Sequence, residues 1–394
     1  MLSLGALLAI VPLYMANTST ILPSLSPDEA ILQSKLVNDS FTLSGVFSKP
    51  VWLPYNLVLL IAQSLNFDSI LSLRLISSIF ILVSVASFYY ILRSWLTKRL
   101  AILSTLLFAT SSWTIHIARI GTPDALFTCS ILALAFAIWL QHTRRRRLIL
   151  LLVALSLLFV YIPGFVWLIF IGIIWQRKRL LEELRRAKLT FQVIFSLLSL
   201  AILAPLFITL VVEPRSLFGL LGLPDTIPSM QTVLTNSSDL FYALFIEGID
   251  DQQRWLPGTP LLSIFSTFMF VIGLYKCWLI RKLDRTKVVI GGIVFWSLLI
   301  AIGGPIRLAV LVPYIFAVVG LGITLMLQQW FTVFPNNNIA RSSALFLMYA
   351  VVFVNVGYNI SHYFIAWAQA PETTQIFSIP NATSDTMYVD QPSN

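Results

Sequence analysis

The chain has 394 residues, of which 58% are hydrophobic and only 11% are charged, and its net charge is +9. A soluble fold with this composition would expose large apolar patches, so the composition excludes an ordinary soluble domain and predicts a membrane protein. Runs of about 20 apolar residues recur along the chain, and each is long enough to cross roughly 30 Å of hydrocarbon. These runs are continuous rather than alternating, so we expect an all-α polytopic protein rather than a β-barrel.

We predict about 11 transmembrane helices from the apolar runs. They lie near residues 2–16, 69–92, 100–115, 123–141, 148–161, 164–175, 190–212, 259–280, 288–303, 307–327 and 343–360. The stretch 148–175 is divided because Pro163 and Gly164 interrupt it, and because basic clusters flank it on both sides, at 144–147 and 176–188. Basic loops beside membrane spans belong in the cytoplasm, so the chain must enter the membrane and return between the two clusters.

This topology leaves most acidic residues on the extracytoplasmic face, and it explains the net positive charge without a nucleic-acid partner. We expect one transmembrane module over residues 1–360, with long outer loops at 17–68 and 213–258. The first outer loop is expected to carry short interfacial helices, and residues 361–394 form a short extracytoplasmic tail. Functional residues concentrate in such loops, so the acids and bases of the outer face are the candidates for a site.

The segment "SPDEA", residues 26–30, begins the first of these short helices. Ser26 can serve as an N-cap, Pro27 as the first helical residue and Glu29 as the partner of Ser26 in a capping box. Acids in a first turn also suit the helix dipole. Asp28 and Glu29 therefore have a purely structural interpretation beside a functional one.

The segment "ARIGTPDALF", residues 118–127, repeats the arrangement. Thr122 is expected to cap a membrane helix that begins at Pro123, with Asp124 in its first turn. Arg119 precedes this helix on the outer face, where a snorkelling arginine beside lipid phosphates is the simple alternative to a role in a site.

Other charged groups fall on the same face. Lys49 lies in "FSKPVW", and Arg307 begins a late span. The loop "GIDDQQRWLPGTPLL" supplies Asp250, Asp251 and Arg254. Cations and acids gathered at one membrane face would suit an anionic, lipid-linked phosphate.

The order of these segments resembles a known family. "SPDEA", "FSKPVW", "LRLISSIF", "ARIGTPDALF" and "PIRLAVLVPYIFAVVGLGI" follow one another as in polyprenyl-phosphate-sugar-dependent glycosyltransferases of the GT-C fold. The chain is most similar to the protein mannosyltransferase-like group that includes the aminoarabinose transferase of lipid A. The resemblance covers the first 140 residues best, residues 300–322 moderately, and the remainder mainly by topology.

The resemblance implies an inverting transfer of a sugar from a polyprenyl-phosphate donor to a hydroxyl of a lipid, glycan or protein acceptor. It makes Asp28 the general base, and it implies that Asp124 holds the acceptor or steadies the first loop. Glu29 points about 100° around the helix from Asp28, so we expect it to have a separate role in orienting the acceptor, the sugar or a metal. It makes Lys49, Arg119 and Arg307 the groups that bind the donor phosphate. Asp250, Asp251 and Arg254 would contact the sugar or acceptor, although a solvated loop is the equal alternative.

A divalent metal is a candidate cofactor, with Glu29 and His362 as its candidate ligands. Ser48 stands where some relatives have an acid before the Lys-Pro pair, which counts against such a site. A sizeable soluble domain, present in many relatives, has no counterpart after the last span. Together with the compact length, this favours a prokaryotic plasma membrane.

Two further functions remain open at this stage. A transporter or flippase for polyprenyl-linked glycans would carry ionisable residues deep in its spans and usually a repeat, whereas the charges here gather at the outer ends. A non-catalytic binding partner for lipid-linked sugars would share the fold and the phosphate site. Retention of the Asp28–Glu29 pair favours the enzyme.

Overall fold

The computed structural model describes residues 10–16, 18–37, 42–48, 50–65, 69–142 and 146–378. Every regular element among these residues is a helix. Most of the first expected span, near 2–16, lies outside the described residues. The part of it that is described, residues 10–16, is helical over 10–15.

The first half of the described chain forms mostly short helices, with one long one. In chain order these are α2 (Thr18–Ile21), α3 (Pro27–Val37), α4 (Leu43–Ser48), α5 (Leu53–Ser64), α6 (Ser69–Trp95), α7 (Lys98–Thr110), α8 (Ser112–Arg119), α9 (Ala125–Thr128), α10 (Ser130–His142), α11 (Arg146–Ser156) and η1 (Leu157–Tyr161). Short helices α2 to α4 before the long α6 agree with the expected loop that carries short helices.

The second half contains the longer helices. These are α12 (Phe165–Arg186), α13 (Leu189–Val212), α14 (Ser216–Leu221), α15 (Met230–Phe245), α16 (Ile264–Leu279), α17 (Asp284–Ala301), η2 (Leu308–Leu311), α18 (Val312–Val333), α19 (Asn338–Ser361), η3 (His362–Trp367) and α20 (Pro371–Ser378).

Several of these helices are compatible with an integral membrane protein. Among the described residues four are long and apolar enough to cross a membrane, namely Ile70–Trp95, Leu189–Val212, Leu308–Val333 and Asn338–Trp367. The bent pair α7 and α8 makes a fifth if it is one span, and four shorter helices are also apolar. About 11 spans remain a prediction.

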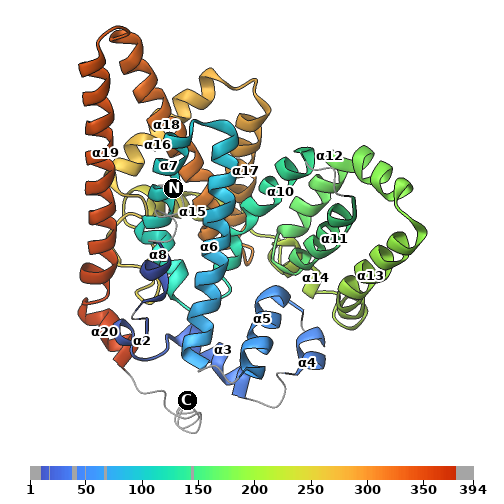
Figure 1. Ribbon diagram of the computed structural model, residues 1–394. Coiled ribbons are helices and arrows are strands. Elements are labelled where there is room, and N and C mark those ends of the chain that lie inside the picture. Colours follow the sequence, from blue (N-terminus) through green and yellow to red (C-terminus); the bar gives the residue numbers. More distant parts are fainter. Residues whose placement is uncertain are drawn as a thin grey trace.

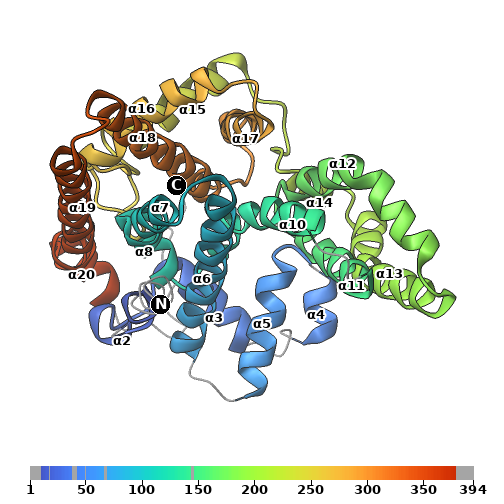
Figure 2. The same ribbon diagram turned by 45° about the horizontal axis from the view of Figure 1, so that its top comes forward.

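Of the four long apolar helices, α18 is the most deeply buried and α13 is the most exposed. Of the most apolar stretch of each, 94% is buried in α18 but only 11% in α13. Helices α10 to α14 form a group to one side of α6, and α16, α18 and α19 lie on the other side (Figures 1 and 2). The apolar surface of α13 is what a helix facing lipid would present.

Glycine allows α16 and α18 to pack backbone against backbone. A Cβ atom at Gly322 would lie 2.0 Å from the carbonyl oxygen of Met269, and one at Gly273 would lie 2.0 Å from that of Val318. Real Cβ contacts are never this short, so each helix needs a residue without a side chain at the crossing. Small residues serve the same purpose in membrane helix pairs generally.

We therefore expect Gly322→Ala to destabilise the protein by about 1–3 kcal/mol, because the two helices must separate to admit the methyl group. Gly357→Ala is the matched control, since Gly357 lies within α19 and a Cβ there would meet no atom within 4 Å. Apparent melting temperatures of the detergent-solubilised variants measure the difference. Equal melting temperatures for the two variants would contradict the close crossing.

Two of the expected spans are broken rather than continuous. The expected span 100–115 is divided into α7 and α8, which are bent by 57°. Ser111 caps α8 by accepting a hydrogen bond from the backbone N–H of Thr114 at 3.2 Å. The expected span 123–141 begins later, at Ala125, and is interrupted at Cys129. Thr122 makes no cap there, because Asp124 is the residue before the first helical turn.

The break predicted at Pro163 and Gly164 is confirmed, because η1 ends at Tyr161 and α12 begins at Phe165. Gly164 has a φ of +80°, a conformation that residues with a side chain rarely adopt. The expected span 164–175 corresponds to the first part of α12, and the helix continues beyond it to Arg186. Its last turns consist mainly of Leu, Arg, Lys, Gln and Glu, which are strong helix formers.

The start of the expected tail packs against the first loop. The backbone N–H of Ser24 donates to the carbonyl oxygen of Phe377 at 3.2 Å, which joins α20 to the segment before α3. Residues 379–394 lie outside the described part of the chain.

Candidate functional site

The capping box expected at Ser26 and Glu29 is present. The Ser26 hydroxyl accepts from the Glu29 backbone N–H at 3.2 Å, and the Glu29 carboxylate accepts from the Ser26 backbone N–H at 2.9 Å. Glu29 differs from an ordinary capping glutamate because its side chain is completely buried. A buried carboxylate needs further partners to offset its lost hydration.

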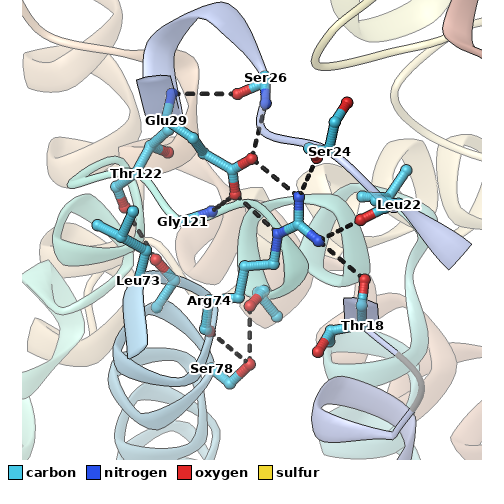
Figure 3. Close-up of polar contacts among 12 residues, drawn as sticks. Thr18, Leu22, Ser24, Ser26, Glu29, Leu73, Arg74, Ser78, Gly121 and Thr122 are labelled. Atoms are coloured by element: carbon cyan, nitrogen blue, oxygen red, sulfur yellow. Dashed lines mark hydrogen bonds and ion pairs between the residues drawn. The ribbon is translucent and has the colours of Figure 1, made fainter. Parts of the chain in front are cut away.

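Arg74, on α6, supplies the countercharge (Figure 3). Its Nε and one terminal nitrogen donate to the two Glu29 carboxylate oxygens, both at 3.0 Å. The backbone N–H of Gly121 donates to the same carboxylate at 2.6 Å. Glu29 thereby connects the start of α3 to α6 and to the segment before α9.

The remaining donors of Arg74 bind the loop that precedes α3. They reach the carbonyl oxygens of Thr18 at 2.9 Å, Leu22 at 2.6 Å and Ser24 at 2.7 Å. All five N–H groups of the guanidinium are therefore used, which is the full capacity of an arginine. The side chain fixes the backbone of residues 18–24 as well as the Glu29 carboxylate.

Gly121 can approach Glu29 only because it has no side chain. A Cβ atom there would lie 2.6 Å from the Leu73 Cβ and 3.0 Å from a Glu29 carboxylate oxygen. We expect Gly121→Ala to cost about 1–3 kcal/mol of stability through overpacking against α6. Gly172→Ala is the control, since a Cβ at Gly172 meets nothing within 4 Å. Equal chemical-denaturation midpoints for the two variants would contradict the expected clash.

Asp28, next to Glu29, lies in a different environment. Its side chain is 31% exposed, and its carboxylate forms an ion pair with Arg254 and accepts a hydrogen bond from it. The Nε of Arg254 also lies 3.6 Å from the Asp251 carboxylate and 3.8 Å from that of Asp124. Three of the acids selected from the sequence therefore meet at one guanidinium, although they come from separate parts of the chain.

This arrangement keeps Arg254 charged. Burial by itself would lower the pKa of the guanidinium, but the three neighbouring carboxylates, Asp124 foremost, raise it above its ordinary value. A single arginine is shared by three acids, and burial raises the pKa of the Asp124 carboxyl above its ordinary value. Such a cluster can accept protons or bind hydroxyl groups that donate hydrogen bonds.

A cavity of about 200 Å³ adjoins the cluster. Asp124, Arg254 and Arg307 line it together with Thr122 and His116. Apolar side chains form the rest of its wall: Trp113, Ile117, Ile120, Ile249, Ile306, Leu308 and Ala309. An apolar pocket with a few convergent charged groups is the usual form of a small-ligand site.

His116 and His362 belong to an aromatic cluster beside this cavity. The His116 ring packs against Trp255, Tyr363 and Trp367 with centroid distances of 4.4 to 4.7 Å. His362 contacts Trp255 and places its Nε2 3.1 Å from the Thr259 hydroxyl. The cluster buries His116, which is 2% exposed and also lines the cavity.

The other expected phosphate-binding residues do not all reach the cavity. Arg119 is buried, donates to the carbonyl oxygens of Leu13 and Ala16 at 2.8 and 2.9 Å, and packs over the Tyr363 and Phe364 rings. It is not among the residues that line the cavity. Arg307 is exposed and does line it.

Lys49 lies outside the described residues, so its position in the site stays a prediction. Three residues later, Trp52 has a φ of +66°, the left-handed region that bulky side chains avoid. Its backbone N–H donates to the carbonyl oxygen of Tyr161 at 2.9 Å, and its ring packs edge-on against Phe127 at 5.2 Å. Trp52 is thus joined to η1 and α9.

The residues proposed as metal ligands do not form a metal site in the described part of the chain. The Glu29 carboxylate is bound by Arg74, Gly121 and Ser26, and His362 is hydrogen-bonded to Thr259. No group of three or more His, Cys, Asp or Glu side chains that could hold a metal ion occurs among the described residues. We therefore assign no step to a metal.

Arg74 is the main residue that the sequence did not single out. It lies in "LRLISSIF", which was noted only as a segment of the resemblance. An arginine in an apolar run of 27 helical residues is costly unless it is paired, and this was the available signal. Asp250, by contrast, is an exposed loop residue.

The comparisons with known proteins do not assign the chain to a family. No protein-family model matches it, and no curated protein matches it significantly.

Proposed function

We propose that the chain is an inverting glycosyltransferase with a GT-C-like bundle of about 11 membrane helices. Its donor is a sugar linked to a polyprenyl phosphate, and its acceptor is a hydroxyl group of a lipid, glycan or protein. The long apolar helices support a membrane location. The order of sequence segments that resembles this family supports the choice of reaction.

One observation carries the proposal. Asp28 and Asp124, which lie in two separate segments of the resemblance, converge on Arg254 beside a cavity lined by Arg307. A glycosyl transfer of this kind needs a carboxylate to accept the proton of the attacking hydroxyl and a cation to bind the departing phosphate. Asp124 and Arg307 supply both kinds of group in the cavity wall. Asp28 does not line the cavity itself and is joined to it through its ion pair with Arg254.

In the proposed reaction the acceptor oxygen attacks the anomeric carbon from the face opposite the phosphate. The new C–O bond forms as the bond to the phosphate oxygen breaks, and that bond's electron pair leaves with the lipid phosphate. The Asp28 carboxylate accepts the hydroxyl proton as attack proceeds. Arg307 stabilises the charge that builds on the leaving phosphate, and Asp124 holds the acceptor or the sugar.

The same proposal places the site on the extracytoplasmic face. The basic clusters at 144–147 and 177–188 favour the cytoplasmic side for the loops that contain them. The acids of the first loop then face outward, where lipid-linked donors are used. The membrane in this proposal is a prokaryotic plasma membrane.

The experiment that tests the function uses the purified chain in lipid nanodiscs. A sugar radiolabelled on a polyprenyl phosphate is compared with the same sugar on a nucleotide, and membranes of the same cell supply the acceptors. We expect label to pass from the lipid donor to an acceptor through a bond that withstands mild acid. We expect no label to pass from the nucleotide donor.

A flippase would give a different result. It would move the lipid-linked sugar between leaflets of a sealed vesicle and leave its bond labile to mild acid. A non-catalytic binding partner would bind the donor and leave both its bond and its leaflet unchanged. Either outcome would replace the transferase proposal.

A further inference from the structure

The loop between α15 and α16, residues 246–263, carries Arg254 and is fixed by contacts that do not involve the Arg254 side chain. The Trp255 indole donates to the carbonyl oxygen of Thr259 at 2.6 Å, and the Trp367 indole donates to that of Gln252 at 2.9 Å. The guanidinium can therefore change partners by rotation of its own side chain while the loop stays in place.

The pairing of Arg254 is incomplete, unlike that of Arg74. Among the described residues its Nε has no hydrogen-bond partner, because the Asp251 and Asp124 oxygens lie 3.6 and 3.8 Å away. Its hydrogen bond to Asp28 uses one terminal nitrogen. Arg74 uses every donor it has and is completely buried, whereas the Arg254 side chain is 21% exposed.

Arg254 also shares a cavity with a second arginine. It lines the same cavity of about 200 Å³ as Arg307. Arg254 and Arg307 are the two cations of this cavity, with Asp124 as the carboxylate in its lining. A phosphate can accept two parallel hydrogen bonds from one arginine. The unused Nε and a terminal nitrogen of Arg254 are the pair of donors that such a contact requires.

We propose that Arg254 alternates between two partners, the Asp28 carboxylate when the site is empty and the phosphate of a polyprenyl-linked ligand when it is occupied. This inference rests on the proposed function, because it takes the donor's phosphate as the ligand. Arg254 is then a positioning residue that keeps Asp28 paired until the donor arrives. The donor binds first, and its phosphate releases the base for the acceptor.

The test measures binding rather than turnover. The full chain in nanodiscs is titrated with polyprenyl phosphate, which carries no sugar to transfer, and with the uncharged polyprenol as a control for chain binding. Arg254→Ala, Asp28→Asn and the double variant are compared with Arg215→Ala. Arg215 is an exposed arginine in another segment and serves as the matched control.

Three results are expected for polyprenyl phosphate. Arg254→Ala weakens binding about tenfold, through loss of charge-assisted hydrogen bonds. Asp28→Asn tightens it several-fold, because the carboxylate no longer competes for Arg254. In the Arg254→Ala background the same Asp28→Asn change has no such effect, and this separates competition from simple removal of a negative charge.

The contrary results are distinct. If Asp28→Asn tightens binding equally in both backgrounds, the carboxylate acts only through its charge, and the change of partners is overturned while the proposed function stands. If Arg254→Ala and Arg215→Ala bind alike, Arg254 does not hold the phosphate. If the native chain binds polyprenyl phosphate and polyprenol equally, the proposed class of donor is wrong and both proposals fail.

Discussion

Glu29→Gln is expected to lower the free energy of unfolding by about 3–5 kcal/mol, because it leaves a charged Arg74 in the protein interior without its counterion. Both side chains are completely buried, so solvent cannot replace the lost carboxylate. The glutamine also carries an amide N–H₂ that would face two donors, Arg74 and the backbone N–H of either Gly121 or Ser26. One buried charge and at least one buried N–H are then left unsatisfied.

Arg74→Lys separates charge from geometry at the same site. An ammonium group keeps the charge but has three donors, whereas the guanidinium uses five. At least two of the acceptors on Glu29, Thr18, Leu22 and Ser24 would lose their partner. We therefore expect a loss of stability comparable to that of Glu29→Gln, and we expect the double variant to lose less than the sum of the two.

The measurement is the apparent melting temperature of the solubilised chain, with Asp28→Asn as the matched control. Asp28 is the neighbouring residue in the same helix turn, but its carboxylate is 31% exposed and its pairing contributes little to stability. If the Glu29→Gln and Asp28→Asn variants had the same apparent melting temperature, the buried pair would not be needed for the fold.

Much of the local structure around this pair could be predicted from the sequence. Ser26 and Glu29 have the spacing of a capping box, whose two hydrogen bonds form within a single helix turn. The burial of Glu29 could not be predicted, because it depends on Arg74, 45 residues away. Sequence spacing specifies contacts within a turn, whereas contacts between helices depend on how the helices pack.

In the candidate site, too, the sequence predicted individual residues but not the contacts between distant segments. The sequence singled out Asp28, Asp124, Asp251, Arg254 and Arg307 one by one from their place in loops and helix ends. It did not indicate that Arg254 would lie against Asp28, which is 226 residues away. It also grouped Arg119 with the cavity cations, whereas packing directs that side chain to the Leu13 and Ala16 carbonyls.

Apolar runs predicted the long helices well and their interruptions poorly. The expected spans 190–212 and 343–360 agree with α13 and α19. Pro163 and Gly164 predicted a break because they disfavour a continuous helix. The bend at Ser111 had no such signal, because serine is tolerated in helices and the bend depends on the cap that Ser111 makes with Thr114.

Asp28→Asn is expected to lower sugar transfer by about 10²–10⁴-fold, the usual contribution of a general base. Asparagine has nearly the same shape but cannot accept the proton of the attacking hydroxyl. Donor binding should survive the change and tighten several-fold, because the proposed phosphate ligands Arg254 and Arg307 remain and the carboxylate no longer competes for Arg254. The loss of activity is therefore expected as a lower maximal rate, and not as a higher donor concentration at half-maximal rate.

The most direct test measures transfer of a radiolabelled sugar from polyprenyl phosphate in membranes that contain the native chain, Asp28→Asn or Asp225→Asn at matched expression. Asp225 is an exposed acid outside the candidate site and controls for loss of charge. We predict that Asp225→Asn labels acceptors like the native chain and that Asp28→Asn labels them at least about a hundredfold more slowly. Equal labelling by all three proteins would contradict the assignment of Asp28 as the base and leave the "SPDE" segment as a helix cap.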